Sequence, residues 1–324
     1  MVKITDTVSV DLEGAKAVKA VVMMGSGELD IKGGAETLME GELAYASEAW
    51  KPIVAYSVED GEGTLVVKPP IREGANLGNP KYEWDIALGD SVPVRLETKV
   101  GSGSVSVTGA GMTLSSVDMA TGSGPATLDL VGDQPELTGV SVKTASGRSQ
   151  LTMDGVYGQL EMIDLASASG TADVELNGDF PALRHLKVSS ASGNVEIAIG
   201  GHFQSLEKLS VNLASGTATV DLSALADVGE ALGTGTVKLD CVSGKMTVIL
   251  PPGAPASIKF TALSGKVDAP GFKADGKRMV NDAWDGEGLR LKMSTVSGKL
   301  KVRAAKPDAE GETEEADPEL VAVT

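Results

Sequence analysis

Residues 187–201 read KVSSASGNVEIAIGG, and 23 residues further on the chain reads SVNLASGTATVDLSA. Each stretch places Ser-Gly between two runs in which apolar and polar residues alternate. Alternation with a period of two is typical of half-buried β-strands. We therefore expect each stretch to form two strands joined at a Ser-Gly bend, and the fixed interval to mark a structural repeat.

The Ser-Gly dipeptide recurs along two thirds of the chain at intervals of 21, 23, 23, 23, 23, 28, 21 and 33 residues. A constant period in this range is the signature of a repeat architecture. The expected corner glycines are Gly103, Gly124, Gly147, Gly170, Gly193, Gly216, Gly244, Gly265 and Gly298.

Apolar residues recur at fixed positions counted from each corner glycine. They lie seven and five residues before it (Leu186 and Val188 in one copy) and two, four and six after it. The residue two before the glycine is also small or apolar, and we expect it to face inward too, because a glycine with positive φ can bend the chain there. This column comprises Ala145, Ala168, Ala191, Ala214, Val242, Leu263 and Val296.

The middle copies also carry a leucine ten residues before the glycine and an aromatic residue three before that, as in Leu183 and Phe180. A unit with three apolar sides buries them by stacking on its neighbours. The sequence thus predicts an all-β fold, a right-handed β-solenoid of about nine rungs with 21–23-residue repeats, roughly 40 Å long.

The period divides the chain into three expected parts. Residues 1–83 lack the period, and we expect them to form a small N-terminal β capping module. Residues 84–304 are expected to form the solenoid. Residues 305–324 are an acidic tail of net charge −6, which we expect to be disordered. Two insertions, 223–235 and 270–288, predict loops, where function is often carried. The last strand, KLKVRAAK, carries outward charges that we interpret as protection of an exposed sheet edge.

Composition narrows the class of protein. A formal charge of −17 argues against nucleic acid as a partner. The single Cys241 excludes an intrachain disulfide framework. No signal sequence or transmembrane segment is visible, so we expect a cytoplasmic protein, or one at the cell envelope or surface if a targeting segment was removed or a partner recruits it.

The search for catalytic chemistry yields no candidate. His185 and His202 lie 17 residues apart and in different rung positions, which does not suit a metal site. Nine corner serines without a histidine base predict a column of hydroxyls that satisfies turn amides, not nucleophiles. We therefore expect no enzyme activity, no cofactor and no metal.

One outward face changes sign along the predicted rod. Acidic residues on adjacent rungs, such as Asp173 and Glu196, leave open a carbohydrate-active enzyme, but a solvated acidic face is the simpler interpretation. Further on the face is basic, which favours self-assembly into a homo-oligomer or binding to a protein partner. The candidate interaction face comprises Asp129, Asp173, Glu175, Glu196, Asp221, Lys245, Lys266, Lys299, Lys301 and Arg303.

Two stretches resemble a known family. Residues 21–46, VVMMGSGELDIKGGAETLMEGELAYA, and 82–107, YEWDIALGDSVPVRLETKVGSGSVSV, are similar to the bacterial toast-rack family of adhesin-like β-solenoid proteins. That family is related to the C-terminal domains of cell-wall-stress response regulators. The resemblance spans roughly residues 15–304 and implies a non-catalytic envelope, scaffold or regulatory role. The leading hypothesis is a structural or adhesin-like scaffold, and the alternative is a regulatory or ligand-binding module that senses a cell-envelope component.

Overall fold

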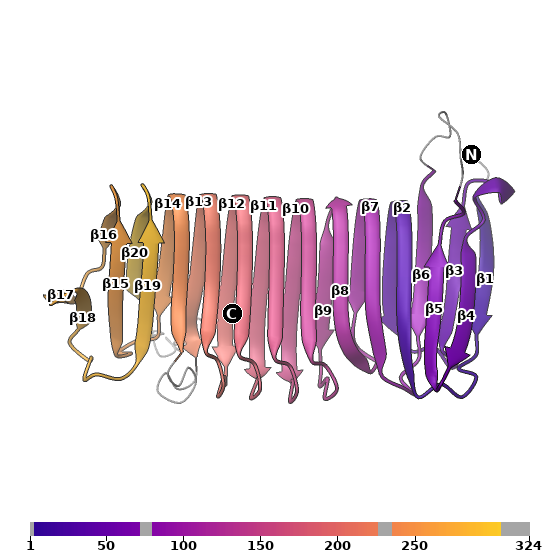
Figure 1. Cartoon of the computed structure of the whole chain (residues 1–324), viewed down its shortest axis with the longest axis horizontal. Coiled ribbons are helices and arrows are strands. Elements are labelled where there is room, and N and C mark those ends of the chain that lie inside the picture. The colour runs from indigo at the N-terminus through magenta and orange to yellow at the C-terminus, as the bar shows by residue number, and fades with distance from the viewer. Residues whose placement is uncertain (1–2, 72–79, 226–234, 306–324) are drawn as a thin grey trace, which may run out of the picture.

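The computed structural model describes residues 3–71, 80–225 and 235–305. Most of these residues form a long stack of parallel strands (Figure 1), which confirms the all-β solenoid. Its centre consists of β10 (Gly139–Val156), β11 (Met162–Asp179), β12 (His185–Gly201) and β13 (Lys208–Leu225). Neighbouring strands pair 23 residues apart, with Gly170 opposite Gly193 and Gly193 opposite Gly216.

The chain bends inside each of these long strands at the Ser-Gly glycine. Gly193 has φ +136°, and a Cβ added there would lie 1.8 Å from the carbonyl oxygen of Gly170. Only glycine fits both the backbone angle and the close approach of the rung below. Positive φ recurs at Gly103, Gly124, Gly147, Gly170 and Gly216. It is absent at Gly244, Gly265 and Gly298, where the positive φ we expected is wrong.

A second glycine column lies eight residues after the first and was missed in the sequence. Gly155 and Gly178 have φ +149° and +128°, and a Cβ on Gly178 would lie 2.1 Å from the carbonyl oxygen of Gly155. Gly111, Gly132 and Gly201 also lie eight residues after a corner glycine and have positive φ. In the sequence, this column could have been recognised because its glycines recur eight residues after the Ser-Gly glycines.

The inward columns seven and five before the corner, and two, four and six after it, are buried on the rungs from Gly103 to Gly244; Val188 and Val211 are fully so. On the rung of Gly265, Phe260, Val267 and Ala269 are only partly buried. The third side contains an aromatic column. The rings of Tyr157 and Phe180 stack with centroids 5.0 Å apart, and those of Phe180 and Phe203 4.8 Å apart. Aromatics are few in this chain, and these three are concentrated where three rungs meet.

We expect Phe180→Leu to lower the free energy of unfolding by about 1–2 kcal/mol, because it removes both ring stacks while keeping an apolar side chain. Phe203→Leu removes one of the two stacks and should cost about half as much. Urea titration followed by circular dichroism measures both. Equal losses would show that ring stacking is not what distinguishes the two sites.

The residue two before the glycine points outward, so the expected inward orientation of this column is wrong. Ala191 is exposed, whereas Ser190, one residue earlier, is 4% exposed. Alternation continues from positions −7 and −5 to −3, and the bend comes only after −2. Inside the corner, the hydroxyls of Thr144 and Ser149 lie 2.8 Å apart, which closes the bend with polar side chains.

The corner serines also differ from expectation. The hydroxyls of Ser169 and Ser215 donate to the carbonyls of Ala145 and Ala191 in the rung before, at 3.4 Å. They satisfy carbonyl groups, not the turn amides that we expected.

The N-terminal end contains a rung that the sequence analysis did not recognise. Strand β2 (Ala17–Gly33) pairs in parallel with β7 (Val94–Thr108) and places Gly27 opposite Gly103. On its other side β2 pairs with β5 (Glu62–Lys68) and β6 (Tyr82–Leu88). The expectation that residues 1–83 lack the repeat is therefore wrong, because Ser26-Gly27 is a further corner.

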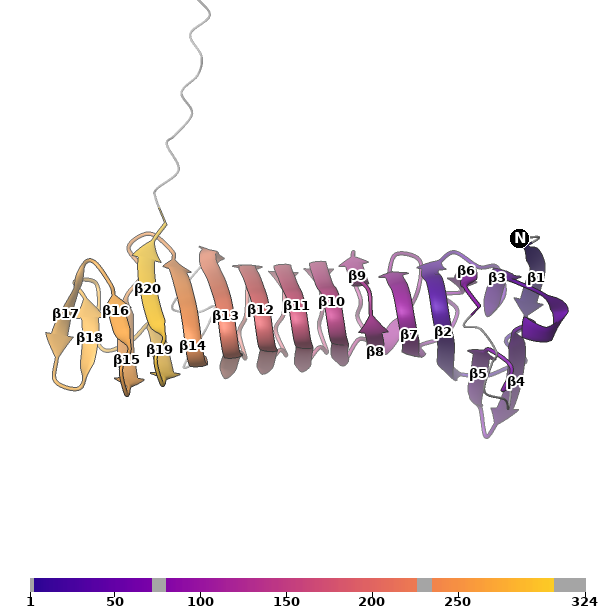
Figure 2. The ribbon, with the colours of Figure 1, turned by 90° about the horizontal axis from the view of Figure 1, so that it is seen from above.

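The remaining N-terminal strands cover this end in antiparallel pairs. β6 pairs with β3 (Met39–Tyr45), β3 with β1 (Ile4–Val10), and β5 with β4 (Ile53–Glu59). A short 3-10 turn, Glu48–Trp50, lies between β3 and β4. Seen from above, the β4–β5 hairpin diverges from β1, β3 and β6 (Figure 2). After β7, the rod continues through β8 (Leu114–Ser123) and β9 (Ala126–Val131).

At the C-terminal end the spatial order departs from the sequence order. Strand β14 (Thr236–Leu250) pairs with β19 (Leu289–Thr295) and β20 (Lys299–Ala304), not with β15 (Ala256–Ala262). β15 pairs with the far side of β19, and β16 (Lys266–Asp268) with the far side of β20. The last rung is thus inserted, as Figure 1 shows.

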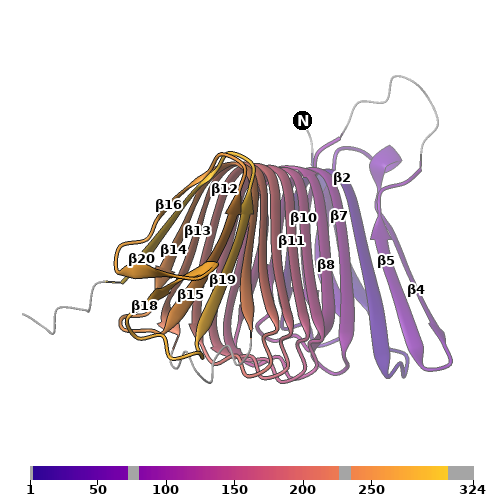
Figure 3. The ribbon, with the colours of Figure 1, turned by 60° about the vertical axis from the view of Figure 1, so that its left-hand side comes forward.

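This insertion corrects two expectations. KLKVRAAK does not form an edge, because β20 lies between β14 and β16. The segment 270–288 is not simply a loop, because β17 (Phe272–Asp275) and β18 (Arg278–Asn281) form an antiparallel hairpin that pairs with β15. Viewed obliquely from this end, the hairpin lies beside the outermost rung (Figure 3). The insertion 223–235 and the tail 305–324 lie almost wholly outside the described residues.

Candidate functional site

The parallel register brings the expected interaction face together on one side of the rod. Positions +3 and +5 after the corner point outward from successive rungs, and Asp173 lies directly opposite Glu196. A shallow hollow of about 420 Å³ lies among these columns, bordered by Asp173, Glu175, Glu196 and Asp221. Asp129 lies in the same column as Glu175, with Thr152 between them.

The partners of these carboxylates favour a solvated or binding surface over catalysis. Asp173 forms an ion pair with Arg148 of the preceding rung, with 2.6 Å between Asp173 Oδ2 and Arg148 Nε. Asp173 is therefore paired with a cation, and not with the second carboxylate that acid/base catalysis on a sugar would need. Asp221 accepts a hydrogen bond from the backbone amide of Ser223. Among the described residues, no group of three or more His, Cys, Asp and Glu side chains is placed to hold a metal ion.

The basic part of the face lies on the last three rungs. Lys245 of β14 lies opposite Lys299 of β20, and Lys299 opposite Lys266 of β16. These side chains are exposed. Lys301 lies 3.9 Å from Asp268, and Arg303 lies opposite Ile249. The insertion of β20 therefore concentrates positive charge more densely than the sequence order suggests.

A second surface feature, which the sequence analysis did not find, is a long groove. It follows positions −4, −3 and −2 from β8 to β15, has a volume of about 1180 Å³, and is lined mostly by small side chains such as Ala168, Ala191 and Ala214. It exists because the −2 column faces outward. At its C-terminal end lie Val242, Val296 and Leu263, which are 55%, 48% and 86% exposed.

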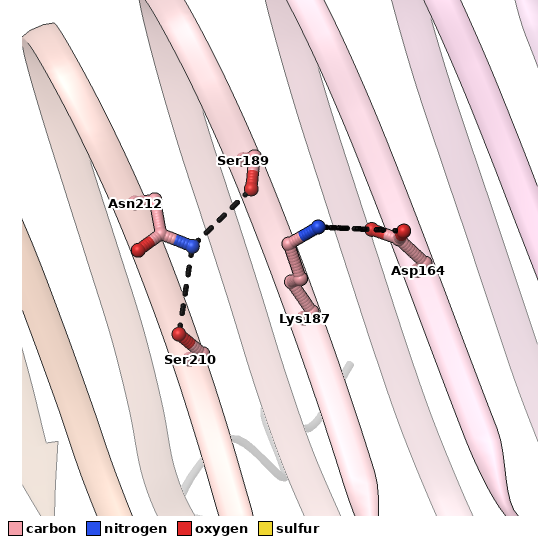
Figure 4. A network of polar contacts seen from close by, with 5 residues as sticks. All are labelled: Asp164, Lys187, Ser189, Ser210 and Asn212. Atoms are coloured by element: carbon pink, nitrogen blue, oxygen red, sulfur yellow. Dashed lines mark hydrogen bonds and ion pairs between the residues drawn. The ribbon is translucent and has the colours of Figure 1, made fainter.

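In the middle of the rod the polar residues of the groove side satisfy one another. Lys187 lies 3.5 Å from Asp164 of the preceding rung. The side-chain amide of Asn212 donates to Ser189 at 3.3 Å and to Ser210 at 3.5 Å (Figure 4). The charges of Lys187 and Asp164 on this side therefore offset each other.

The buried thiol is also part of this region. Cys241 lines the groove floor at position −3 and is 4% exposed, and burial raises the pKa of its thiol. A raised pKa keeps the thiol protonated and unreactive at neutral pH. His185 is the first residue of β12 and His202 follows its last residue, and neither lines the groove.

No helix among the described residues is long and apolar enough to cross a membrane.

The N-terminal part of the chain matches a known protein family. The model described as the N-terminal domain of toast_rack, DUF2154, matches residues 1–154. Residues 1–154 thus match a toast-rack N-terminal domain. The resemblance recognised in the sequence is confirmed. No curated protein sequence matches the chain significantly.

The match to the toast-rack domain ends inside β10 and contains β2, the further N-terminal rung. Of the charged face it includes Asp129, whereas Glu175 and the basic residues follow it. The groove also begins in the toast-rack domain, at Ala120, and extends beyond it to Leu263.

Three solved structures align with 94% of this chain. A "putative cell adhesion protein" from Clostridium sporogenes shares 18% identity over all of its own chain, with a TM-score of 0.34. A "putative lipid binding protein" from Parabacteroides distasonis shares 12% identity over 97% of its chain, with a TM-score of 0.37. A "putative adhesin" from Parabacteroides merdae shares 10% identity over 96% of its chain, with a TM-score of 0.29.

Proposed function

We propose that the protein is a non-catalytic, adhesin-like scaffold that associates with copies of itself through the charged face. The observation that carries the proposal is the change of sign along this face. Glu175, Glu196 and Asp221 lie on β11–β13, and Lys245, Lys299 and Lys266 lie on the next three rungs. A regular β-stack holds these charges in fixed columns about 4.8 Å apart from rung to rung.

A face of this kind is complementary to itself when two rods lie antiparallel. A two-fold axis across the rod, near the boundary between β13 and β14, places the acidic half of each molecule on the basic half of the other. Such an isologous contact uses each pair of patches twice and closes after two subunits. Electrostatic complementarity gives this association its orientation and register.

We expect a charge-swap experiment to reveal this contact by light scattering. The variant Lys245→Glu/Lys299→Glu reverses two charges of the basic half of the face, and Glu175→Lys/Glu196→Lys reverses two charges of the acidic half. Each variant alone should be monomeric, because like charges then oppose one another. An equimolar mixture should associate, and salt should weaken that association. The mixture is more decisive than salt alone, because the net charge of −17 also repels.

Three outcomes would count against the proposal. Association that persists in both single variants would place the contact at strand edges or apolar surfaces. A mixture that stays monomeric would exclude the antiparallel contact. A wild-type protein that is monomeric at all concentrations would favour the alternative, a regulatory module that binds a cell-envelope component. The cytoplasmic location expected from the sequence stays a prediction.

A further inference from the structure

The end of the groove on β14, β19 and β15 differs from the rest because its large apolar side chains are exposed in one column. The amide of Ser297 donates to the carbonyl of Val242 at 3.0 Å, and that of Ser264 to the carbonyl of Val296 at 2.9 Å. These bonds place Val242, Val296 and Leu263 side by side, in that order. We call this set the apolar column.

A column of three lysines borders the apolar column on the same strands. Lys238 lies opposite Lys292, and Lys292 opposite Lys259. Each lysine precedes its apolar neighbour by four residues, so lysines and apolar column point to the same outer face. Within the described part of the chain, Lys238 is the member with an ion pair, to Asp240 at 2.5 Å.

Across the corner lies a second lysine column, Lys245, Lys299 and Lys266, three residues after the apolar column. The last three rungs therefore repeat one arrangement: lysine, apolar residue, lysine. Like charges directly opposite one another on paired strands are destabilising. In the middle of the rod, by contrast, Lys187 has Asp164 as its neighbour (Figure 4). The repeated lysines thus form a surface that an anion would stabilise.

We propose that this end of the groove binds an anionic amphiphile with one acyl chain, its head between the lysine columns and its chain along the groove. The groove crosses the rungs from β15 to β8, which at about 4.8 Å per rung gives roughly 30 Å of length. Small side chains such as Ala191 and Ala168 line its course, which leaves space for an extended apolar chain. Charge complementarity assigns the head to the C-terminal end, because positive charge is concentrated there.

The column Lys245, Lys299 and Lys266 also belongs to the charged face. The test of amphiphile binding therefore changes Lys259 and Lys292 of the other lysine column, which the self-association proposal does not use. The probe is palmitate below its micelle concentration, titrated into the full chain by calorimetry. We expect saturable binding with one molecule per chain. Hexadecyltrimethylammonium, with the same chain length and a positive head, should bind at least ten-fold more weakly.

Two exposed alanines on β12 supply a matched pair of variants. Ala191→Trp fills the groove and should weaken palmitate binding at least ten-fold. Ala198→Trp adds the same side chain on the charged face of the same strand and should leave binding unchanged. Lys259→Glu/Lys292→Glu should weaken the binding of palmitate, and should reduce or reverse the ratio by which the protein prefers palmitate over the cationic amphiphile. Circular dichroism of each variant verifies the fold.

The proposal is overturned if palmitate does not bind, or if Ala198→Trp weakens binding as much as Ala191→Trp. It is also overturned if the protein binds phosphatidylglycerol vesicles but not monomeric palmitate, because the surface would then be a membrane-docking patch. Equal binding of both amphiphiles would exclude the lysine columns as the head-group site.

Discussion

Gly193→Ala is expected to lower the free energy of unfolding by about 3–5 kcal/mol, the upper end of what single substitutions do. The backbone at Gly193 has φ +136°, which costs a residue with a Cβ about 1–2 kcal/mol. The new Cβ would also lie 1.8 Å from the carbonyl oxygen of Gly170, and 2.9 and 3.0 Å from two further backbone atoms of the same residue. Since these are backbone atoms inside a paired strand, the rungs themselves must separate.

Two other glycines isolate the two contributions. Gly132 has φ +102° but open space around its Cβ position, so Gly132→Ala should cost about 1–2 kcal/mol from the backbone angle alone. Gly158 has neither positive φ nor a neighbour within 4 Å, and Gly158→Ala should stay within about 0.5 kcal/mol of the wild type. Urea titrations of the three variants test this order. If Gly193→Ala lowered the free energy of unfolding no more than Gly132→Ala does, the close contact between rungs at the corner would not contribute to the loss of stability.

Val188→Asp is expected to lower the free energy of unfolding by about 3–5 kcal/mol, because it leaves an uncompensated charge in the rod interior. Val188 is fully buried and lies between Leu165 and Val211 of the adjoining rungs. No cationic residue belongs to this inward column. Val211→Asp, one rung further on, should behave alike.

Asn194→Asp provides the control, because Asn194 is exposed on the same strand and should tolerate the change. The pH dependence checks the mechanism. Burial raises the pKa of the introduced carboxyl above its unfolded value, so the destabilisation is complete at neutral pH and shrinks as falling pH protonates the group. Equal melting temperatures for the three variants, or a Val188→Asp defect that does not shrink in acid, would contradict the inward assignment.

The sequence predicted those parts of the fold that depend on one residue in a repeating position. Val188 and Val211 point into the rod interior, as the alternation of apolar and polar residues around them predicted. Phe180 lies between two other rings because the 23-residue interval places one aromatic residue above another. The charged face could likewise be predicted, since a regular register converts Asp173 and Glu196 in sequence into neighbours in space.

Where the prediction failed, the local pattern was ambiguous. Ala191 is small enough for either side of a strand, and the buried residue beside it, Ser190, is polar, so alternation could not be followed to the bend. The groove was missed for this reason. The order of the last rungs was not predictable, because every rung has the same register and β15 and β19 are equally able to pair with β14. Ser26-Gly27, in contrast, was visible, with Ala20, Val22 and Leu29 at the expected spacings.

The inserted C-terminal rung sets the order of events during synthesis on the ribosome. A chain that grows from its N-terminus can add β10 through β14 as each emerges, since each pairs with the strand made just before it. β15 emerges next, yet its native partner β19 is synthesised about 30 residues later. Until then β14 presents an unpaired edge in the register that β15 also fits, so premature pairing competes with the native order. The outermost rung is therefore held in place by β19 and β20, which are made after it, and release before residue 304 leaves that rung without the complete strands on which it stacks.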